Sequence, residues 1–407
     1  MSETPWLTVI GLGEDGPEGM APASRAALEM AEVVMAPPRH LALVADVLDP
    51  ETPCIPWPVP FADGIPQLIA LRGQRVAVLA SGDPFWFGAG SVLARHLAPG
   101  EWQALPGPSA FSLAAARLGW ALERTVCLGL HAAPLDRLRP HMANGERAIV
   151  LLTGGAAVEA LGEWLTNRGF GLTTIHVMEA LGGPRERFTT ATADTVVGDD
   201  LETPLCVALE FRGTGEALTT ASGRADDLFD HDGQITKRPV RALTLSALAP
   251  TPGAHLWDIG GGSGSVSVEW CLSHPRTRAT TVERDSDRAE RIRANARSFG
   301  VDNRMALVEA DALTALHSPE MWEDLPQAVF IGGGLSADVL KILTARLTRG
   351  TRIVANAVTL ESEMLLTDWH VRLGGDLMRI ELAESRPLGT RHGWQAVRPI
   401  VQWSAVL

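Results

Sequence analysis

Short apolar runs alternate with longer helical runs along most of the chain. In the first half, residues 6–10 and 75–80 have the β-type apolar character of buried strands, and the Ala- and Leu-rich stretch 23–36 predicts a helix between them. Such an alternation is typical of a mostly parallel sheet covered by helices. The pattern therefore predicts the α/β fold class.

Loops rich in glycine and proline follow the predicted strands of the first half, at residues 11–17, 81–84, 106–109 and 153–155. The carboxyl ends of parallel strands are where open α/β sheets bind their ligands. Four such loops in one half predict a ligand-binding cleft.

A second α/β series begins after a polar segment. Residues 204–211 have the pattern of a last strand, and the Gly-, Thr- and Asp-rich stretch after them predicts a linker. We therefore expect a first domain at 1–212, a linker at 213–228 and a second domain at 229–407, because 407 residues are enough for two or three cores. The second domain is predicted to be doubly wound, with strands at 255–259, 279–283, 305–309, 328–331 and 352–355 and helices at 240–248, from 265, at 286–299 and at 337–347.

A glycine-rich turn follows the first predicted strand of the second domain. Its residues are Gly260, Gly261, Gly262, Ser263 and Gly264. Without a Cβ, glycine lets the backbone turn tightly and approach a ligand closely. Glu283 ends the next strand 19 residues after Gly264, near the spacing of about 20 residues at which an acid binds ribose hydroxyls. A plain strand-to-helix turn would explain the glycines alone, but the two features together favour an adenosine cofactor.

The glycine spacing favours S-adenosylmethionine over a dinucleotide. A G-x-G-x-G run with Asp258 two residues before it differs from the G-x-G-x-x-G of pyrophosphate binders, and S-adenosylmethionine has no phosphate to bind. Asp311, after the strand at 305–309, is placed to accept from the adenine amino group, although a helix N-cap explains it equally well. The loop 331–335 has three glycines and lacks the N/D-P-P-Y/F group of amide and adenine methylases, which favours a carbon acceptor or a large ligand.

Composition narrows the function classes. The formal net charge of −13 at pH 7 disfavours nucleic acid as a partner, because proteins that bind phosphate backbones carry positive patches. Four cysteines without a C-x-x-C pair and eleven histidines without ligand spacing predict neither a disulfide framework nor a metal site. The chain opens without a charged-then-apolar leader and contains no apolar stretch of about 20 residues. We therefore expect a soluble, cytoplasmic protein with no membrane partner.

The first domain resembles the tetrapyrrole methylase family in its motifs at residues 11–13, 38–40, 79–84, 106–109 and 115–119. The resemblance implies two α/β subdomains with a cleft that binds S-adenosylmethionine. It implies that the cofactor is bound by Gly82, Asp83, Pro84, Pro108, Ser109 and Ala110. The first loop departs from the G-x-G-P-G-D usual in the family, because Glu14 and Asp15 follow the second glycine and the proline is delayed to Pro17.

The second domain resembles Rossmann-like, S-adenosylmethionine-dependent precorrin methyltransferases, in its motifs at 235–237, 256–260, 282–285, 331–334, 355–361 and 386–389. The order of the two halves is similar to that of the bifunctional precorrin methyltransferase family of aerobic cobalamin biosynthesis. This resemblance implies transfer of two methyl groups, from two S-adenosylmethionine sites, to C5 and C15 of precorrin-6Y (precorrin-6B). It also implies decarboxylation of the ring-C acetate to give precorrin-8X, a tetrapyrrole as the small-molecule partner, and a homo-oligomer.

Further site residues in the second domain follow from the same resemblance. Thr236 and Ala312 are expected to bind the cofactor together with the glycine turn, Glu283 and Asp311. No catalytic residue is assigned, and the candidates for positioning the acceptor are Gly333, Asn356 and Glu361.

Four basic residues are candidates for binding the acetate and propionate groups of the acceptor. They are Arg39 and His40 in the first domain and Arg386 and Arg391 near the C-terminus. Guanidinium groups bind carboxylates bidentately, although solvated surface arginines are an equally good explanation.

Two other functions stay open at this point. An NAD-linked oxidoreductase would use the same glycine turn, but it would need a His or Lys beside a substrate arginine and would leave the first domain unexplained. A non-catalytic tetrapyrrole carrier with decayed methylase halves would not need the intact glycines and Glu283. Cofactor competition tests the first alternative, and release of S-adenosylhomocysteine tests the second.

Overall fold

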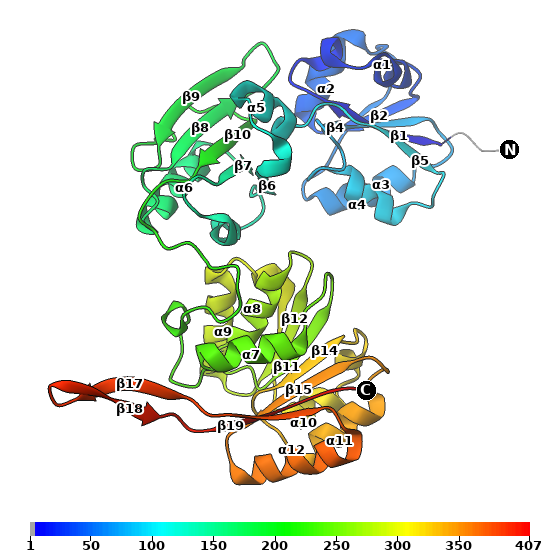
Figure 1. Cartoon of the computed structure of the whole chain (residues 1–407). Helices are drawn as coiled ribbons and strands as arrows, with labels where there is room; N and C mark the ends of the chain where they lie inside the picture. The colour runs from blue at the N-terminus through cyan, green and yellow to red at the C-terminus, as the bar shows by residue number, and fades with distance from the viewer. Residues whose placement is uncertain (1–4) are drawn as a thin grey trace. The chain divides into compact units, whose positions relative to one another are not determined.

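The computed structural model describes residues 5–407, which form two compact units (Figure 1). The first unit contains residues up to 135 and 141–217, and the second unit contains 136–140 and 218–407. The division after Ala217 lies inside the segment 213–228 that the sequence indicates as a linker. Within the described range, no helix is both long and apolar enough to cross a membrane.

Two five-stranded sheets form the first unit, one in each of two α/β subdomains. The first sheet is parallel, in the order β3-β2-β4-β1-β5, and consists of β1 (Leu7–Leu12), β2 (Val33–Ala36), β3 (Cys54–Pro56), β4 (Val76–Ser81) and β5 (Trp102–Leu105). The second sheet is mixed, in the order β6-β7-β10-β8-β9, and consists of β6 (Val126–Gly129), β7 (Arg147–Leu152), β8 (Thr174–Glu179), β9 (Arg187–Thr192) and β10 (Leu205–Glu210). The helices are α1 (Pro22–Glu29), α2 (Pro38–Val44), α3 (Gly64–Ile69), α4 (Gly90–Leu93), α5 (Ala110–Leu118) and α6 (Gly155–Asn167).

One predicted helix of the first unit is wrong. The stretch 23–36 contains α1, which ends at Glu29, and the separate strand β2, which begins at Val33. Every residue of β2 is buried, and valine packs well on the pleated surface of a sheet. The tertiary environment therefore overrides the helical composition of this run.

A seven-stranded sheet forms the centre of the second unit, in the order β13-β12-β11-β14-β15-β19-β16. Its strands are β11 (His255–Ile259), β12 (Arg278–Glu283), β13 (Met305–Glu309), β14 (Ala328–Ile331), β15 (Arg352–Ala357), β16 (Asp376–Ile380) and β19 (Ile400–Val406), and β17 (Ala383–Leu388) and β18 (Arg391–Ala396) pair separately. Its helices are α7 (Arg238–Leu248), α8 (Ser265–Ser273), α9 (Ser286–Ser298), α10 (Ala312–His317), α11 (Ala337–Arg346) and α12 (Leu360–Leu373). The order reverses between β11 and β14, and such a switch point is where open α/β sheets bind ligands.

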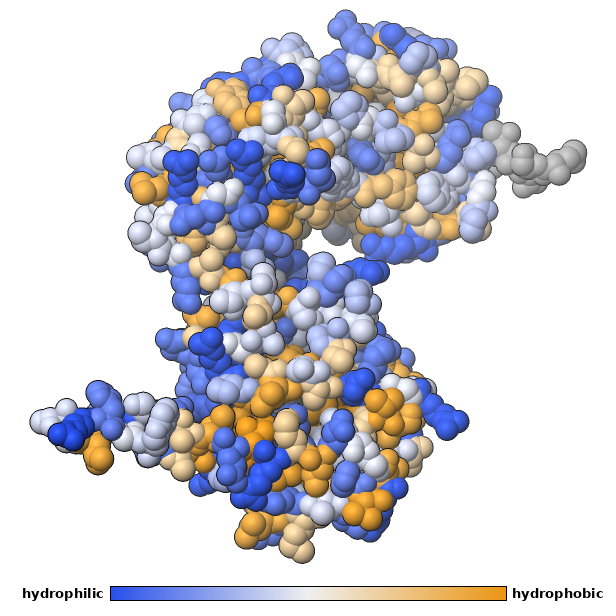
Figure 2. All heavy atoms as spheres, in the orientation of Figure 1, coloured by the Kyte–Doolittle hydropathy of each residue, from blue (hydrophilic) through white to orange (hydrophobic). Residues whose placement is uncertain are grey.

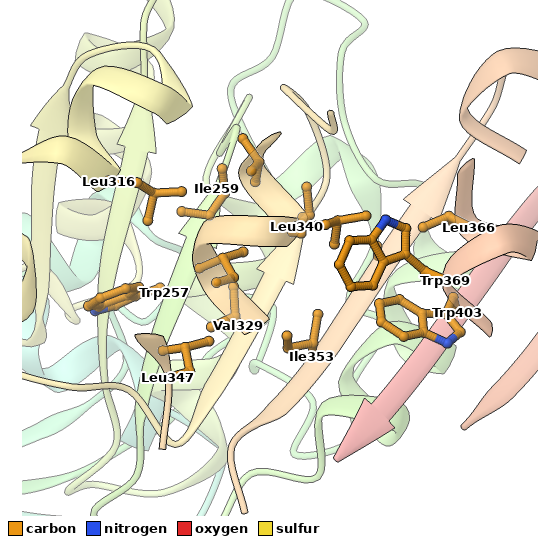
Figure 3. Close-up of a cluster of buried hydrophobic side chains, with 14 of the residues drawn as sticks. Trp257, Ile259, Leu316, Val329, Leu340, Leu347, Ile353, Leu366, Trp369 and Trp403 are labelled. Carbon is orange, nitrogen blue, oxygen red and sulfur yellow. The ribbon is translucent and has the colours of Figure 1, made fainter. Parts of the chain in front are cut away.

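The two faces of this sheet carry separate hydrophobic cores. On β11, Trp257 and Ile259 pack toward α10, α11 and α12 (Figure 3), whereas Leu256 packs toward α7 and α8 on the other face. Because both faces are covered by helices, β11 and β14 are buried at every position. This is why they could be located from the sequence.

Candidate functional site

A pocket of about 370 Å³ lies at the carboxyl ends of the parallel strands of the second unit. Its lining includes the loops that follow β11, β12, β13 and β14, together with Asn356 of β15. The segment 234–237, which precedes α7, also lines the pocket. The cofactor-binding residues expected from the sequence that line it are Thr236, Gly260, Gly261, Gly262, Glu283, Asp311 and Ala312, and Gly333 lines it as well.

The glycine turn has a backbone conformation that other residues adopt with strain. Gly260, Gly262 and Gly264 have φ angles of 73°, 60° and 71°. A Cβ on Gly260 would lie 2.5 Å from the Cα of Gly333, so the loops after β11 and β14 are in direct contact. By contrast, a Cβ on Gly262 would meet only the carbonyl oxygen of Gln234, at 3.2 Å. The pocket therefore has a wall of exposed backbone.

Glu283 holds this turn. Its buried carboxylate accepts hydrogen bonds from the backbone N–H groups of Gly262, at 2.8 Å, and Asp285, at 3.0 Å. A carboxylate has about four acceptor positions, so the two oxygens can also accept from ligand hydroxyls. Glu283 can thus both shape the turn and bind a ribose.

Asp311 is an N-cap. It accepts from the N–H groups of Leu313 and Thr314, both at 3.0 Å, and from the Thr314 hydroxyl. These hydrogen bonds, first of all the one from the Thr314 hydroxyl, lower the pKa of Asp311. Asp311 is therefore the N-cap of α10, and its side chain also lines the pocket.

Two buried side-chain oxygens near the turn have no hydrogen-bond partner among the described residues. Asp258 accepts from the Ser267 hydroxyl through Oδ2, at 2.7 Å, but its Oδ1 and the Ser263 hydroxyl have no partner among the described residues. Burial raises the pKa of Asp258 from 3.8 to about 6. Neither Asp258 nor Ser263 lines the pocket, so the fit to an adenosine cofactor rests on the cradle of bare backbone at Gly262 beside the carboxylate of Glu283.

Asn356 is fixed by two partners that sequence reasoning missed. Its Nδ2 donates to the Thr244 hydroxyl at 3.0 Å, and its Oδ1 accepts from Nε2 of Gln402 at 2.9 Å. Thr244 and Gln402 are buried polar residues on α7 and β19. Glu361 lies at the exposed start of α12 and is not among the residues that line the pocket.

A buried ionic cluster supports the segment 234–237. Nε of Arg241 donates to Glu269 at 2.7 Å, and its Nη1 donates to the carbonyl oxygen of Thr236. Glu269 also accepts from the backbone N–H groups of Gly223 and Arg224. Sequence reasoning missed this ionic cluster. The sequence did contain a signal for it, because Arg241 on α7 and Glu269 on α8 each have apolar residues on both sides.

The first unit contains a larger cavity of about 620 Å³. The end of β1 and the loops after β4 and β5 meet at Gly82, which lines the cavity. The N–H of Gly107 donates to the Gly82 carbonyl at 3.0 Å, and a Cβ on Gly11 would lie 1.9 Å from that same oxygen. Aromatic side chains from both subdomains line the cavity, and so do Gly82, Pro108 and Ala110. Asp83, Pro84 and Ser109 are not among the lining residues; Asp83 accepts from the N–H of Phe85, and Ser109 caps α5.

Arg39 and His40 are brought together at this cavity. Nη2 of Arg39 lies 2.9 Å from Nε2 of His40 and 3.0 Å from the Ser81 hydroxyl, and its Nη1 pairs with Glu14, which the sequence did not indicate as a site residue. A guanidinium only donates, so Nε2 of His40 is the acceptor. Burial, followed by the charge of Arg39, lowers the pKa of His40 to about 4, which makes it neutral at pH 7.

Arg386 and Arg391 lie apart from both cavities. They belong to the β17–β18 hairpin, which projects from the second unit (Figure 2), and neither residue lines a described cavity. Arg386 pairs with Glu384 on the same strand.

Comparison with known proteins identifies the class and then the family. A family model described as tetrapyrrole (corrin/porphyrin) methylases matches residues 7–197, and one described as precorrin methyltransferase domain matches residues 227–407. Together with the two α/β units and their strand-end pockets, these matches define a two-domain tetrapyrrole methyltransferase.

A Sinorhizobium sp relative, named precorrin-6Y C(5,15)-methyltransferase [decarboxylating], is 47% identical over 98% of this chain and 96% of its own length. A relative of the same name from Mycobacterium tuberculosis is 39% identical over 98% of this chain and 99% of its own. The chain belongs to the family of precorrin-6Y C(5,15)-methyltransferases (decarboxylating). A solved C-terminal domain of such an enzyme from Rhodobacter capsulatus is 54% identical and covers 47% of this chain and all of that chain, with a TM-score of 0.44. The Sinorhizobium and Mycobacterium relatives support neither the oxidoreductase nor the carrier.

Proposed function

We propose that this enzyme transfers two methyl groups to precorrin-6Y (precorrin-6B), at C5 and C15, and removes the ring-C acetate carboxylate as carbon dioxide to give precorrin-8X. The observation that carries the proposal is family membership over 98% of the chain, with one strand-end cavity in each unit. S-adenosylmethionine, the methyl donor of the family, supplies a methyl group on a sulfonium. We further propose two donor sites, with C5 assigned to the first unit and C15 to the second.

The residues of the second unit suit a reaction that depends on positioning. Methyl transfer needs the donor and acceptor carbon in line with water excluded, and it needs no covalent nucleophile. The exposed backbone of Gly262 and the carboxylate of Glu283 would hold the donor, while Gly333 leaves room for a macrocycle.

Asn356 is our candidate for orienting the ring-C acetate. Its Nδ2 has a second hydrogen besides the one donated to Thr244, and the side chain lines the pocket. Loss of carbon dioxide requires an electron sink, for which the conjugated macrocycle can serve. The part of the protein is to desolvate and orient one carboxylate.

Arg386 and Arg391 are proposed to bind acceptor carboxylates in an assembly. The hairpin exposes 71% of Leu388 and 80% of Trp394, which is consistent with contact with a second copy of the chain. We propose a cytoplasmic homo-oligomer, in which the free cysteines fit a reducing compartment. Light scattering that gives a monomer mass would contradict the oligomer.

The test is mass spectrometry of the products that each half, expressed separately, forms from the metal-free precursor. Residues from about 225 onward are expected to add one methyl group and release carbon dioxide. The first unit, expressed separately, is expected to add one methyl group, at C5. Methyl addition by the second half without decarboxylation would refute the assignment.

A further inference from the structure

An ionic cluster on the cavity wall of the first unit has no assigned role. Glu14, in the loop after β1, lies between two arginines, with Oε1 paired to Nη1 of Arg39 and Oε2 at 3.4 Å from Nη2 of Arg185. Only 9% of the Glu14 side chain is exposed, compared with 35% for Arg39 and 54% for Arg185. Glu14 and Arg39 both line the cavity, so this carboxylate is a nearly buried anion beside the proposed acceptor site.

The cluster connects the two subdomains of the first unit. Arg39 belongs to α2 beside the first sheet, whereas Arg185 follows β8 of the second sheet. The loops approach closely, because a Cβ on Gly183 would lie 2.6 Å from the Cβ of Glu14. Nη1 of Arg185 also pairs with Glu202 at 2.7 Å, which holds the arginine beside Glu14. Arg185 therefore has a second partner besides Glu14, and it approaches the cavity wall behind Glu14 without lining the cavity itself.

The geometry favours a bound anion between these two guanidinium groups. His40 and Ser81 hold Nη2 of Arg39, which leaves Nη1 directed at Glu14. Burial lowers the pKa of Arg39, and the nearby positive charge of Arg185 lowers it further. Two converging cations repel each other unless an anion lies between them. Without Glu14, the same groups would form a site for one carboxylate.

We propose that Glu14 occupies the position taken by an acetate or propionate group of the acceptor, and that Arg39 and Arg185 form a two-arginine clamp for that group. The inference rests on the proposed function, because it requires a carboxylate-rich acceptor in this cavity. Replacement of one carboxylate by another leaves the charge of the cluster unchanged, so neither arginine becomes unpaired. The exchange also selects against acceptors whose side chain is a neutral amide or ester.

The test measures the acceptor KM for C5 methylation by the full chain. Glu14→Gln removes the internal competitor with little change of shape and is expected to lower this KM about three- to tenfold, whereas Arg185→Ala is expected to raise it about tenfold. Lysine at 185 restores only part of the loss, because it lacks the planar fork. Arg117→Ala is the matched control, since it breaks the 2.7 Å surface pair with Glu186 next to the same loop and is expected to leave KM unchanged.

Near-ultraviolet circular dichroism of each full-length variant, compared with that of the wild type, reports whether the first unit is folded. A higher KM for Glu14→Gln, or equal effects of Arg185→Ala and Arg117→Ala, would overturn the clamp. If the wild-type chain does not methylate C5, the proposed function of the first unit fails instead. In that case, the dissociation constant of the tetrapyrrole is measured from its change in absorbance on binding. A roughly tenfold weaker affinity of Arg185→Ala supports the clamp, and an unchanged affinity overturns it.

Discussion

The pocket of the second unit combines glycine backbone with charged side chains of both signs, whereas the cavity of the first unit is lined largely by apolar side chains beside one ionic cluster. In the second unit, Gly260 and Gly262 expose backbone and Glu283 holds the turn. In the first unit, Trp57, Phe87 and other apolar groups surround a cavity of about 620 Å³. The contrast shows that two sites at strand ends of one chain can differ in chemistry. The pocket of the second unit suits a cofactor, and the apolar cavity of the first unit suits a cofactor and also the flat face of a macrocycle.

The largest effect is expected from valine at one glycine of each unit. Gly262 has φ 60°, and Gly82 has φ 54° with a Cβ position 2.8 Å from the carbonyl oxygen of Pro108, so a side chain is strained at both. Gly262→Val is expected to abolish C15 methylation and carbon dioxide release, and Gly82→Val to abolish only C5 methylation, by at least about a hundredfold. Product masses measure both outcomes, and each variant is the control for the other. If either variant lost both activities, the two units would not work through separate sites.

The second unit was the more predictable of the two. Strand limits at 255–259, 305–309 and 328–331 match the structure. β11 and β14 are buried at every position, whereas β13 lies at the edge of the sheet, and its limits follow from the apolar run 305–308. In the first unit, β2 was assigned to a helix, since a four-residue buried strand after an Ala-rich helix has no distinct period.

Contacts between distant residues were out of reach of the sequence. Glu14, Arg39 and Arg185 meet only because two subdomains pack together, and no local pattern encodes that contact. Thr244 and Gln402 likewise reach Asn356 from a helix and an antiparallel strand. Residues within the strand-end loops could be predicted because the topology places all such loops at one edge.

The next largest effect concerns the buried pair Arg241–Glu269. Arg241→Leu leaves Glu269 charged and buried, so we expect a loss of roughly 3–5 kcal/mol in the free energy of unfolding of the second unit. The matched control is Arg278→Leu, which breaks a largely exposed pair with Asp324 and should change stability by about 1 kcal/mol or less. Urea denaturation of the full chain, with C15 activity as the probe, measures both. Similar urea midpoints for the two variants would show that the buried pair Arg241–Glu269 stabilises the second unit no more than the exposed pair does.

Asp258 predicts a pH dependence confined to the second unit. Its pKa is about 6 in the folded protein against 3.8 ordinarily, so the folded state holds this proton more tightly than the unfolded chain. Its contribution to stability is therefore full below about pH 4 and lost as the pH rises through about 6, by at most about 3 kcal/mol. Asp258→Asn stays neutral and should remove this slope in urea denaturation between pH 4 and 7. An unchanged slope would assign the pH dependence to other groups.

A smaller effect is expected at Glu283. Glu283→Ala removes the acceptor for two backbone N–H groups and for ligand hydroxyls, and should weaken cofactor binding to the second unit by roughly 1.5–3 kcal/mol. Glu290→Ala, at an exposed position of α9, is the control and should leave affinity unchanged. Calorimetric titration measures both variants. Equal affinities would limit Glu283 to a role in the turn.

The most direct test of two independent donor sites is calorimetric titration of the full chain with S-adenosylhomocysteine. We expect two molecules bound per wild-type chain, and one each for Gly82→Val and Gly262→Val. One molecule per wild-type chain, lost entirely in Gly262→Val, would contradict the account.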